Sequence, residues 1–129
     1  MIRRTILIGL LAIASLGVTS APVAAKTGAV TSSGNCSASS TWKLKLSPDD
    51  TRIEVEFQVD QNRNNRQWRV SLSQNGTFVS RVTRLTKAPS GSFTIRWLRP
   101  NHACADRFVA KATNVLTGEV CRRSVSVSF

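Results

Sequence analysis

Along the chain from Thr41 onward, apolar and polar residues alternate in short runs, and this feature constrains the fold more than any other. The alternate apolar positions of the first two runs are Trp42, Leu44 and Leu46, and then Ile53, Val55, Phe57 and Val59. Successive side chains of a β-strand point to opposite faces, so residues two apart share a face. The spacing predicts two strands that each bury one face, with a turn at 47–50 between them.

Five further runs follow the same rule. In the third run Trp68, Val70 and Leu72 share a face, and Asn75-Gly76 follows directly. This dipeptide suits a two-residue hairpin turn because both of its residues tolerate positive φ. The later runs lie at 77–86, 93–97, 108–112 and 125–129, and the first of these alternates weakly, as we expect of an edge strand.

Seven short strands, each with one apolar face, predict an all-β fold in which two antiparallel sheets pack face to face. An immunoglobulin-like or fibronectin III-like sandwich formed by residues 41–129 is the leading arrangement. Trp42, Trp68 and Trp97 occupy inward-facing positions and are expected in its core. Residues 26–40 are rich in Ser, Thr, Gly and Ala and have little to bury, so we expect them to form a flexible lead-in.

The N-terminal segment has the pattern of a secretory signal peptide. Arg3 and Arg4 precede an apolar run at 6–18, and small residues follow at 23–25. The apolar run has about 13 residues, whereas a membrane-spanning helix needs roughly 20. We therefore expect residues 1–25 to be removed before Lys26, which gives a secreted protein with no transmembrane segment in the mature chain.

The charge balance narrows the class of partner. Of the 18 Lys and Arg residues, the signal peptide contains two, which leaves 16 against 7 Asp and Glu and a net charge of +9. Such a balance favours anionic partners outside the cytoplasm, such as cell-wall polymers, acidic polysaccharides or phospholipid head groups. A specific nucleic-acid partner is not expected of an exported chain. The alternative is that the charge only keeps the protein soluble.

The three cysteines are predicted to form one disulfide. A hairpin loop at 116–118 would place Cys121 opposite about residue 113, so Cys104 would lie about 30 Å away along the partner strand. A disulfide needs Cα atoms within about 7 Å. If seven strands alternate in direction, the first and seventh begin at the same end of the sandwich. Cys36 precedes the first strand and Cys121 opens the seventh, so we predict that these two residues pair.

Cys104 is then left unpaired, and its role stays open between three alternatives. It is a small thiol shielded beneath its loop, a reactive thiol, or the link of a disulfide-bonded dimer.

Several stretches of the chain resemble known sequences. They are CSASSTWKLKLSPDD, RIEVEFQVD, QWRVSLSQNGT, APSGSF and AKATNVLTGEVC, which together extend over residues 36–121. These stretches resemble small exported proteins of actinomycete-type bacteria whose activity is not characterised. In that group the two recurring cysteines correspond to Cys36 and Cys121, whereas Cys104 departs from the pattern. The resemblance implies no activity, ligand or active residue.

We find no catalytic, metal-binding or cofactor-binding pattern in the sequence. His102 is the single histidine, and three cysteines at these spacings do not make a zinc site. A hydrolase needs a nucleophile beside a positioned base, and neither His102 with Asp106 nor His102 with Cys104 has the sequence context of such a site. We therefore predict a protein that is not an enzyme and uses no cofactor, with an unrecognised enzyme site as the least favoured alternative.

Arginines provide the candidate binding site. If the third and fourth strands are neighbours, Arg69, Arg81 and Arg84 can face one anion together, and the planar guanidinium suits this contact. Scattered solvated charges are the alternative. We predict a secreted, non-enzymatic binding or interaction module that engages anionic cell-wall polymers through basic surface residues. A secreted inhibitor or accessory protein that docks a protein partner through an edge strand or loop is the rival hypothesis.

Overall fold

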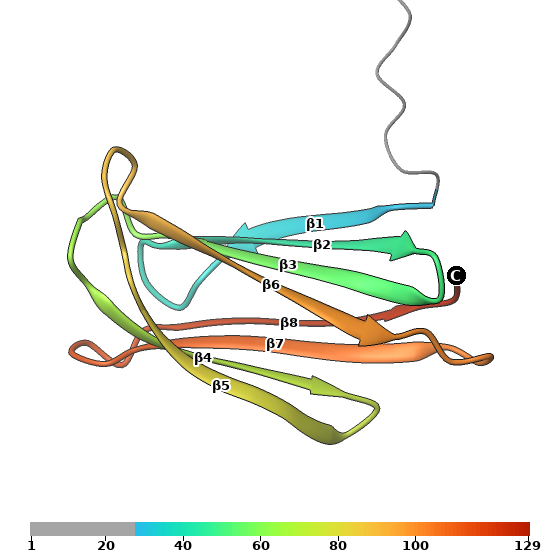
Figure 1. Cartoon of the computed structure of the whole chain (residues 1–129). Coiled ribbons are helices and arrows are strands. Elements are labelled where there is room, and N and C mark those ends of the chain that lie inside the picture. The colour runs from blue at the N-terminus through green and yellow to red at the C-terminus, as the bar shows by residue number, and fades with distance from the viewer. Residues whose placement is uncertain (1–27) are drawn as a thin grey trace, which may run out of the picture.

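The computed structural model describes residues 28–129, which form eight β-strands and no helix (Figure 1). The strands are β1 (Val30–Asn35), β2 (Thr41–Asp49), β3 (Arg52–Asp60), β4 (Gln67–Gln74), β5 (Thr77–Leu85), β6 (Ser92–Pro100), β7 (Asp106–Asn114) and β8 (Val120–Val127). The predicted signal peptide and its cleavage site lie outside the described residues. Within residues 28–129 there is no helix long and apolar enough to span a membrane.

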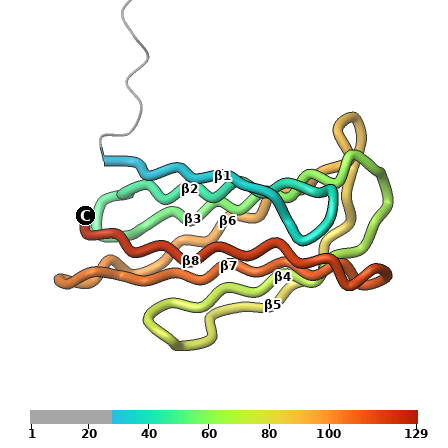
Figure 2. The backbone as a smooth tube through the Cα atoms, turned by 180° about the vertical axis from the view of Figure 1, so that it is seen from behind, coloured from blue at the N-terminus to red at the C-terminus, as the bar shows by residue number. Residues whose placement is uncertain are grey.

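The strands form two antiparallel sheets, which are stacked as two layers (Figures 1 and 2). The first sheet has the order β1-β2-β3-β6 and the second has the order β5-β4-β7-β8. The all-β sandwich predicted from the alternating pattern is confirmed. The finer prediction of an immunoglobulin-like or fibronectin III-like arrangement stays a prediction.

Strand β1 corrects two predictions, that the sandwich has seven strands and that residues 26–40 form a flexible lead-in. It pairs with β2 along its whole length, from Val30 opposite Leu46 to Asn35 opposite Thr41. Its sequence is VTSSGN, and none of its residues is fully buried. Backbone pairing rather than an apolar face therefore holds β1, which is why an alternating pattern does not reveal it.

The core lies between the two sheets and consists of alternate apolar positions from every strand except β1 and β5. Trp42 and Trp68 are buried as predicted, and the ring of Trp68 lies 6.4 Å from that of Phe93. Trp97 is only partly buried and packs against the core from the edge strand β6. Complete burial of each large apolar side chain contributes about 1.5–3 kcal/mol, so these strands hold one another in place.

At one end of the sandwich a disulfide joins the two sheets. We call this the loop end; it consists of loops 36–40, 61–66, 86–91 and 115–119. The predicted pair, Cys36 before β2 and Cys121 on β8, is bonded, with Cα atoms 4.3 Å apart. The buried carboxylate of Glu119 accepts hydrogen bonds from the N–H groups of Ala38 and Ser40 and from Ser40 Oγ, at 3.0, 2.9 and 2.7 Å. The pairing prediction is confirmed.

The opposite end has a second connection between the sheets, made by hydrogen bonds. Gln74 on β4 donates from Nε2 to the backbone oxygen of Pro100 on β6, at 2.8 Å, and its Oε1 accepts from Arg99 Nε at 3.0 Å. Gln74 Nε2 also donates to Oδ1 of Asp106 on β7, at 2.9 Å. The two sheets are therefore linked at both ends.

Loops 61–66 and 86–91 are fixed to one another. The N–H of Asn65 donates to the oxygen of Thr86, and the N–H of Thr86 donates to the oxygen of Arg66, at 2.8 and 2.9 Å. The buried Thr86 hydroxyl also donates to the backbone oxygen of Arg63. Gly91 has a φ of +67°, and a Cβ there would collide with the backbone of Arg63. The loop end therefore presents Arg63 and Arg66 from a fixed backbone.

Candidate functional site

The outward-facing side of the second sheet carries cations and no acids. On this sheet Trp68, Val70 and Leu72 are buried, so the positions that alternate with them on β4 point outward. The residues opposite these alternate positions on the neighbouring strands also point outward. Five outward positions of the four strands are cationic and exposed: Arg69, Arg81, Arg107, Lys111 and Arg122. Every other outward position on these strands is uncharged. We call this surface the basic face.

Three cations of the basic face lie in one row across the strands. Ser71 on β4 is opposite Arg81 on β5 and also opposite Lys111 on β7. Lys111 is in turn opposite Arg122 on β8. Since neighbouring strands are about 4.8 Å apart, the row extends over roughly 14 Å. Arg69 lies two residues from Ser71 on the same side of β4, so it adds a further charge beside the row.

Two arginines of the basic face have partners that orient them without neutralising them. Arg107 donates from Nε to Ser124 Oγ at 3.0 Å. The guanidinium of Arg81 lies 5.8 Å from the centroid of the Phe78 ring, and Phe78 is itself 61% exposed. Hydroxyl and ring partners leave the positive charge in place. Both side chains therefore stay available to an anion.

Arg84 does not join this surface, which corrects the prediction that Arg69, Arg81 and Arg84 face one anion together. Arg84 is opposite Trp68, whose side chain is fully buried, whereas Arg69 is opposite Thr83. Because side chains alternate between faces, Arg84 projects from the inward-facing side of edge strand β5. The structure brings together Arg69 and Arg81, and it places Arg84 on the other side of the sheet.

The outward-facing side of the first sheet differs, because its cations alternate with acids. We call it the mixed face, and its charged residues are Lys43, Lys45, Asp49, Arg52, Glu54, Glu56, Asp60 and Arg96. Glu56 on β3 is opposite both Lys45 on β2 and Arg96 on β6, and Arg96 Nη2 lies 3.4 Å from Glu56 Oε1. Positive charge on this face is therefore balanced within the protein.

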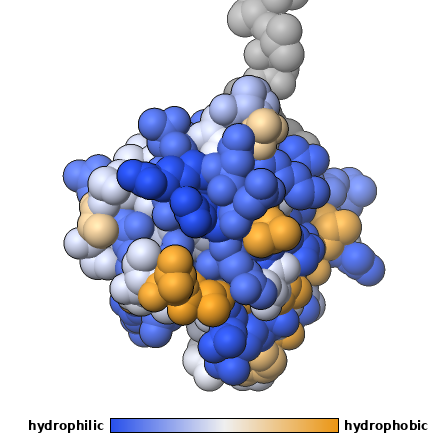
Figure 3. Space-filling model, turned by 90° about the vertical axis from the view of Figure 1, so that its left-hand side faces the viewer, coloured by the Kyte–Doolittle hydropathy of each residue, from blue (hydrophilic) through white to orange (hydrophobic). Residues whose placement is uncertain are grey.

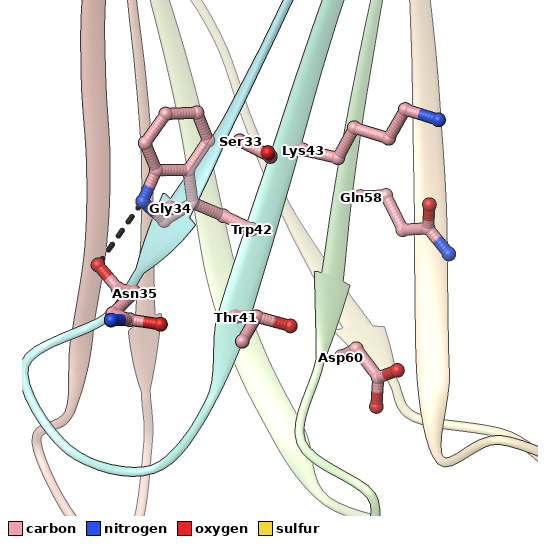
Figure 4. A pocket seen from close by; sticks show the side chains of 8 residues that line it. All are labelled: Ser33, Gly34, Asn35, Thr41, Trp42, Lys43, Gln58 and Asp60. Carbon is pink, nitrogen blue, oxygen red and sulfur yellow. Dashed lines mark hydrogen bonds between the residues drawn. The ribbon is translucent and has the colours of Figure 1, made fainter.

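A hollow of about 390 Å³ lies where β1, β2 and β3 approach the loop end, and Ser33, Lys43, Gln58 and Asp60 are among the residues that line it (Figure 4). Figure 4 shows Lys43, Gln58 and Asp60 projecting to one side of the sheet and the Trp42 indole to the other, over Gly34. Trp42 Nε1 donates to the backbone oxygen of Asn35 at 3.2 Å. The polar groups do not converge on one point, so the hollow forms no defined binding site.

His102 and Asp106 meet at the end opposite the loop end. His102 Nδ1 lies 2.6 Å from Asp106 Oδ1, and the His102 N–H donates to Asp106 Oδ2 at 2.9 Å. Burial by itself raises the pKa of Asp106, but hydrogen bonds from His102, Gln74 and Asn75 outweigh it and lower the pKa to about 2. Within residues 28–129 no hydrogen bond joins His102 to a serine or to Cys104. This pair fixes the loop before β7.

Cys104 is free and exposed in the same loop, so the prediction that it is unpaired is confirmed and a thiol shielded beneath the loop is ruled out. A Cys104-linked dimer stays a prediction.

Cys121 is opposite Ala112 rather than residue 113, because the hairpin closes between Asn114 and Glu119 around a four-residue loop. In the described part of the chain, no three His, Cys, Asp or Glu side chains gather as a metal site.

Sequence reasoning missed three members of the basic face, namely Arg107, Lys111 and Arg122. The alternating run predicted at 108–112 places Phe108, Ala110 and Ala112 inward, so the outward direction of Arg107 and Lys111 follows from the same pattern. The alignment of these residues with Arg122 and Arg81 could not be predicted from the alternating pattern, because it depends on which strands are neighbours and on their register.

No protein-family model, no curated protein and no solved structure matches this chain. The resemblance to small exported actinomycete-type proteins therefore stays a prediction.

Proposed function

We propose that this protein is an exported, non-enzymatic binding module that engages anionic polymers of the cell envelope through its basic face. The observation that supports the proposal is the cross-strand pair Lys111–Arg122 in one row with Arg81, on a face with no acid. Like charges directly opposite one another destabilise a sheet. A bound anion relieves this repulsion, so the free energy that the fold loses here is recovered on binding.

The arrangement favours an extended polymer over a small anion. The row of cations extends over roughly 14 Å, which is longer than one phosphate or carboxylate group. A polymer whose charges repeat along its length makes several weak contacts at once, and arginine adds paired hydrogen bonds to each oxyanion. The intramolecular disulfide accords with an oxidising location outside the cytoplasm.

The test is a pelleting assay with purified cell walls of the producing bacterium and residues 26–129 of the protein. All eight strands, the core and the disulfide lie within this part of the chain, so it folds as a unit. One variant combines Arg81→Ser, Lys111→Ser and Arg122→Ser. The matched control combines Lys43→Ser, Lys45→Ser and Arg96→Ser, which removes the same charge from the mixed face.

We expect the basic-face variant to bind on the order of tenfold or more weakly than the wild type, because exposed charge contacts contribute up to about 1 kcal/mol each. The control should retain most of its binding, and high salt should weaken wild-type binding. Equal losses in both variants would show that net charge alone is responsible. Binding that resists high salt and both variants would point instead to a protein partner.

A further inference from the structure

We infer a second interaction surface, at the loop end, that docks on an anionic phospholipid bilayer. It consists of Leu85, Val115 and Leu116, whose exposed fractions are 48%, 48% and 84%, and we call these three residues the apolar rim. None of the five cations of the basic face belongs to the rim, although Leu85 projects from the same side of the second sheet. The inference therefore does not rest on the proposed polymer binding.

The three apolar residues are brought together by β4. The N–H of Val115 donates to the backbone oxygen of Gln67 at 3.0 Å, and Leu85 on β5 is opposite Gln67. Val115 and Leu85 therefore flank one position of β4, and Leu116 follows at the tip of the β7–β8 hairpin. Figure 3 looks onto the loop end and shows apolar side chains gathered within a mostly hydrophilic surface.

The tip is rigid before any partner arrives. Asn114 Oδ1 accepts hydrogen bonds from the N–H groups of Leu116 and Thr117, both at 2.9 Å. The N–H of Gly118 donates to the backbone oxygen of Asn114 at 2.9 Å, and Gly118 adopts a φ of 75°, which glycine tolerates best. Leu116 is thus held outward by the fold, so docking it requires little ordering of the loop.

The charges around the rim favour an anionic surface. Arg63, Arg66 and Lys87 are exposed at this end, and Arg63, Arg66 and Leu116 line one hollow of about 220 Å³. Two acids lie nearby: Asp60, at the end of β3, accepts from the N–H of Asn62 at 2.8 Å, and Glu119 is buried with loop 36–40. Positive charge here therefore has no opposing exposed carboxylate among the described loop residues.

A bilayer presents the complementary chemistry. Anionic head groups attract basic residues close to the membrane surface, and apolar side chains enter the boundary between head groups and acyl chains. A protein partner is less suited, because energetically dominant interface residues are usually Trp, Tyr or Arg in well-packed pockets. The rim is aliphatic, and its residues Val115 and Leu116 lie on the projecting β7–β8 hairpin (Figure 1). The exposed aromatic residues Phe78 and Phe129 lie at the opposite end.

The experiment measures partitioning of residues 26–129 onto vesicles of phosphatidylcholine and phosphatidylglycerol in equal parts, and onto phosphatidylcholine alone. Leu116→Ser is compared with Leu98→Ser, which removes a leucine that is 50% exposed on β6, away from the rim. We expect Leu116→Ser to weaken partitioning onto the mixed vesicles on the order of tenfold, because the lost apolar burial is that of one leucine. Leu98→Ser should leave it unchanged, and neutral vesicles should bind weakly.

A direct readout of insertion complements the affinities. In Leu116→Trp, the emission of the new indole should shift to shorter wavelength when mixed vesicles are added, whereas Leu98→Trp should show no shift. The inference is overturned if Leu116→Ser and Leu98→Ser partition alike, or if the Leu116→Trp emission stays unchanged. Vesicle binding that only the basic-face variant abolishes would also overturn it, and would leave the polymer proposal intact.

Discussion

Both outer faces of this sandwich are formed by antiparallel sheets, but cations are accompanied by acids on one face and not on the other. On the mixed face, Glu56 stands between Lys45 and Arg96, so the row that contains two cations also includes an acid. On the basic face, the equivalent cross-strand neighbours are Lys111 and Arg122, and no acid is present. A sheet surface selected for stability alone would resemble the mixed face, because opposite charges across strands are favourable and like charges are not. The difference supports the proposal that the basic face is the one that binds.

The two faces belong to one rigid unit only if the two sheets stay joined. Removal of the disulfide between Cys36 and Cys121 should have the largest effect on this connection. The bond closes a loop with a sequence separation of 85 residues. Replacing both cysteines with Ala should lower the free energy of unfolding on the order of 4 kcal/mol, because the unfolded chain regains the entropy of the open loop. Urea denaturation measures the loss, and Cys104→Ser, which changes an exposed thiol, is the control. An unchanged midpoint for the double variant would contradict the account.

Acid should weaken the connection at the other end, with a smaller effect. The folded-state pKa of Asp106 is about 2, below its ordinary value of 3.8. Its contribution is therefore fully present above about pH 4 and is lost as the pH falls from there toward 2, by roughly 2 kcal/mol in total. Urea denaturation at several pH values should show this decline in the wild type. Asp106→Asn should be less stable at neutral pH and should lack that part of the pH dependence.

Charge reversal at equivalent positions should have opposite effects on the two faces. Lys111→Glu places an acid opposite Arg122, whereas Lys45→Glu places an acid opposite Glu56. We expect Lys111→Glu to stabilise the fold by about 0.5 kcal/mol while it weakens polymer binding, and Lys45→Glu to destabilise the fold by a similar amount. Thermal denaturation at low and high salt measures both changes, which salt should reduce. If both variants changed the stability of the fold in the same direction, the proposed difference between the two faces would be contradicted.

The smallest effect should come from the ion pair on the mixed face. Arg96 Nη2 and Glu56 Oε1 are 3.4 Å apart, and the Arg96 side chain is 68% exposed. An exposed pair of this kind contributes between 0 and about 1 kcal/mol, so Glu56→Gln should lower the unfolding free energy by less than about 1 kcal/mol. Chemical denaturation detects this change. A larger loss would mean that the mixed face contributes more to the fold than its geometry indicates.

The sequence predicted the sandwich well because each buried strand repeats the same two-residue spacing, as in Ile53, Val55 and Phe57. It missed β1, whose VTSSGN sequence offers no apolar face and is held by backbone pairing with β2. Gly34 marks the one close contact, because a Cβ there would collide with the ring of Trp42. Propensity and periodicity carry no information about such a strand.

The candidate site was only partly predictable. Arg69 and Arg81 were placed on neighbouring strands, and the structure brings them to one face. Arg84 was assigned to the wrong side because residues three apart on a strand project to opposite faces, so Arg81 and Arg84 cannot share one; Arg84 is opposite the buried Trp68. The row with Lys111 and Arg122 requires the pairing of β4 with β7, a long-range contact that one sequence does not specify.

Amide chemical-shift mapping is the most direct test of the central claim. Residues 26–129, labelled with nitrogen-15, would be titrated with a soluble anionic oligomer released from the cell wall. The account predicts that the largest shifts lie on the basic face, at Arg69, Arg81, Lys111 and Arg122, and that Lys45, Glu56 and Arg96 on the mixed face shift little. Shifts of equal size on both faces, or confined to the mixed face, would contradict it.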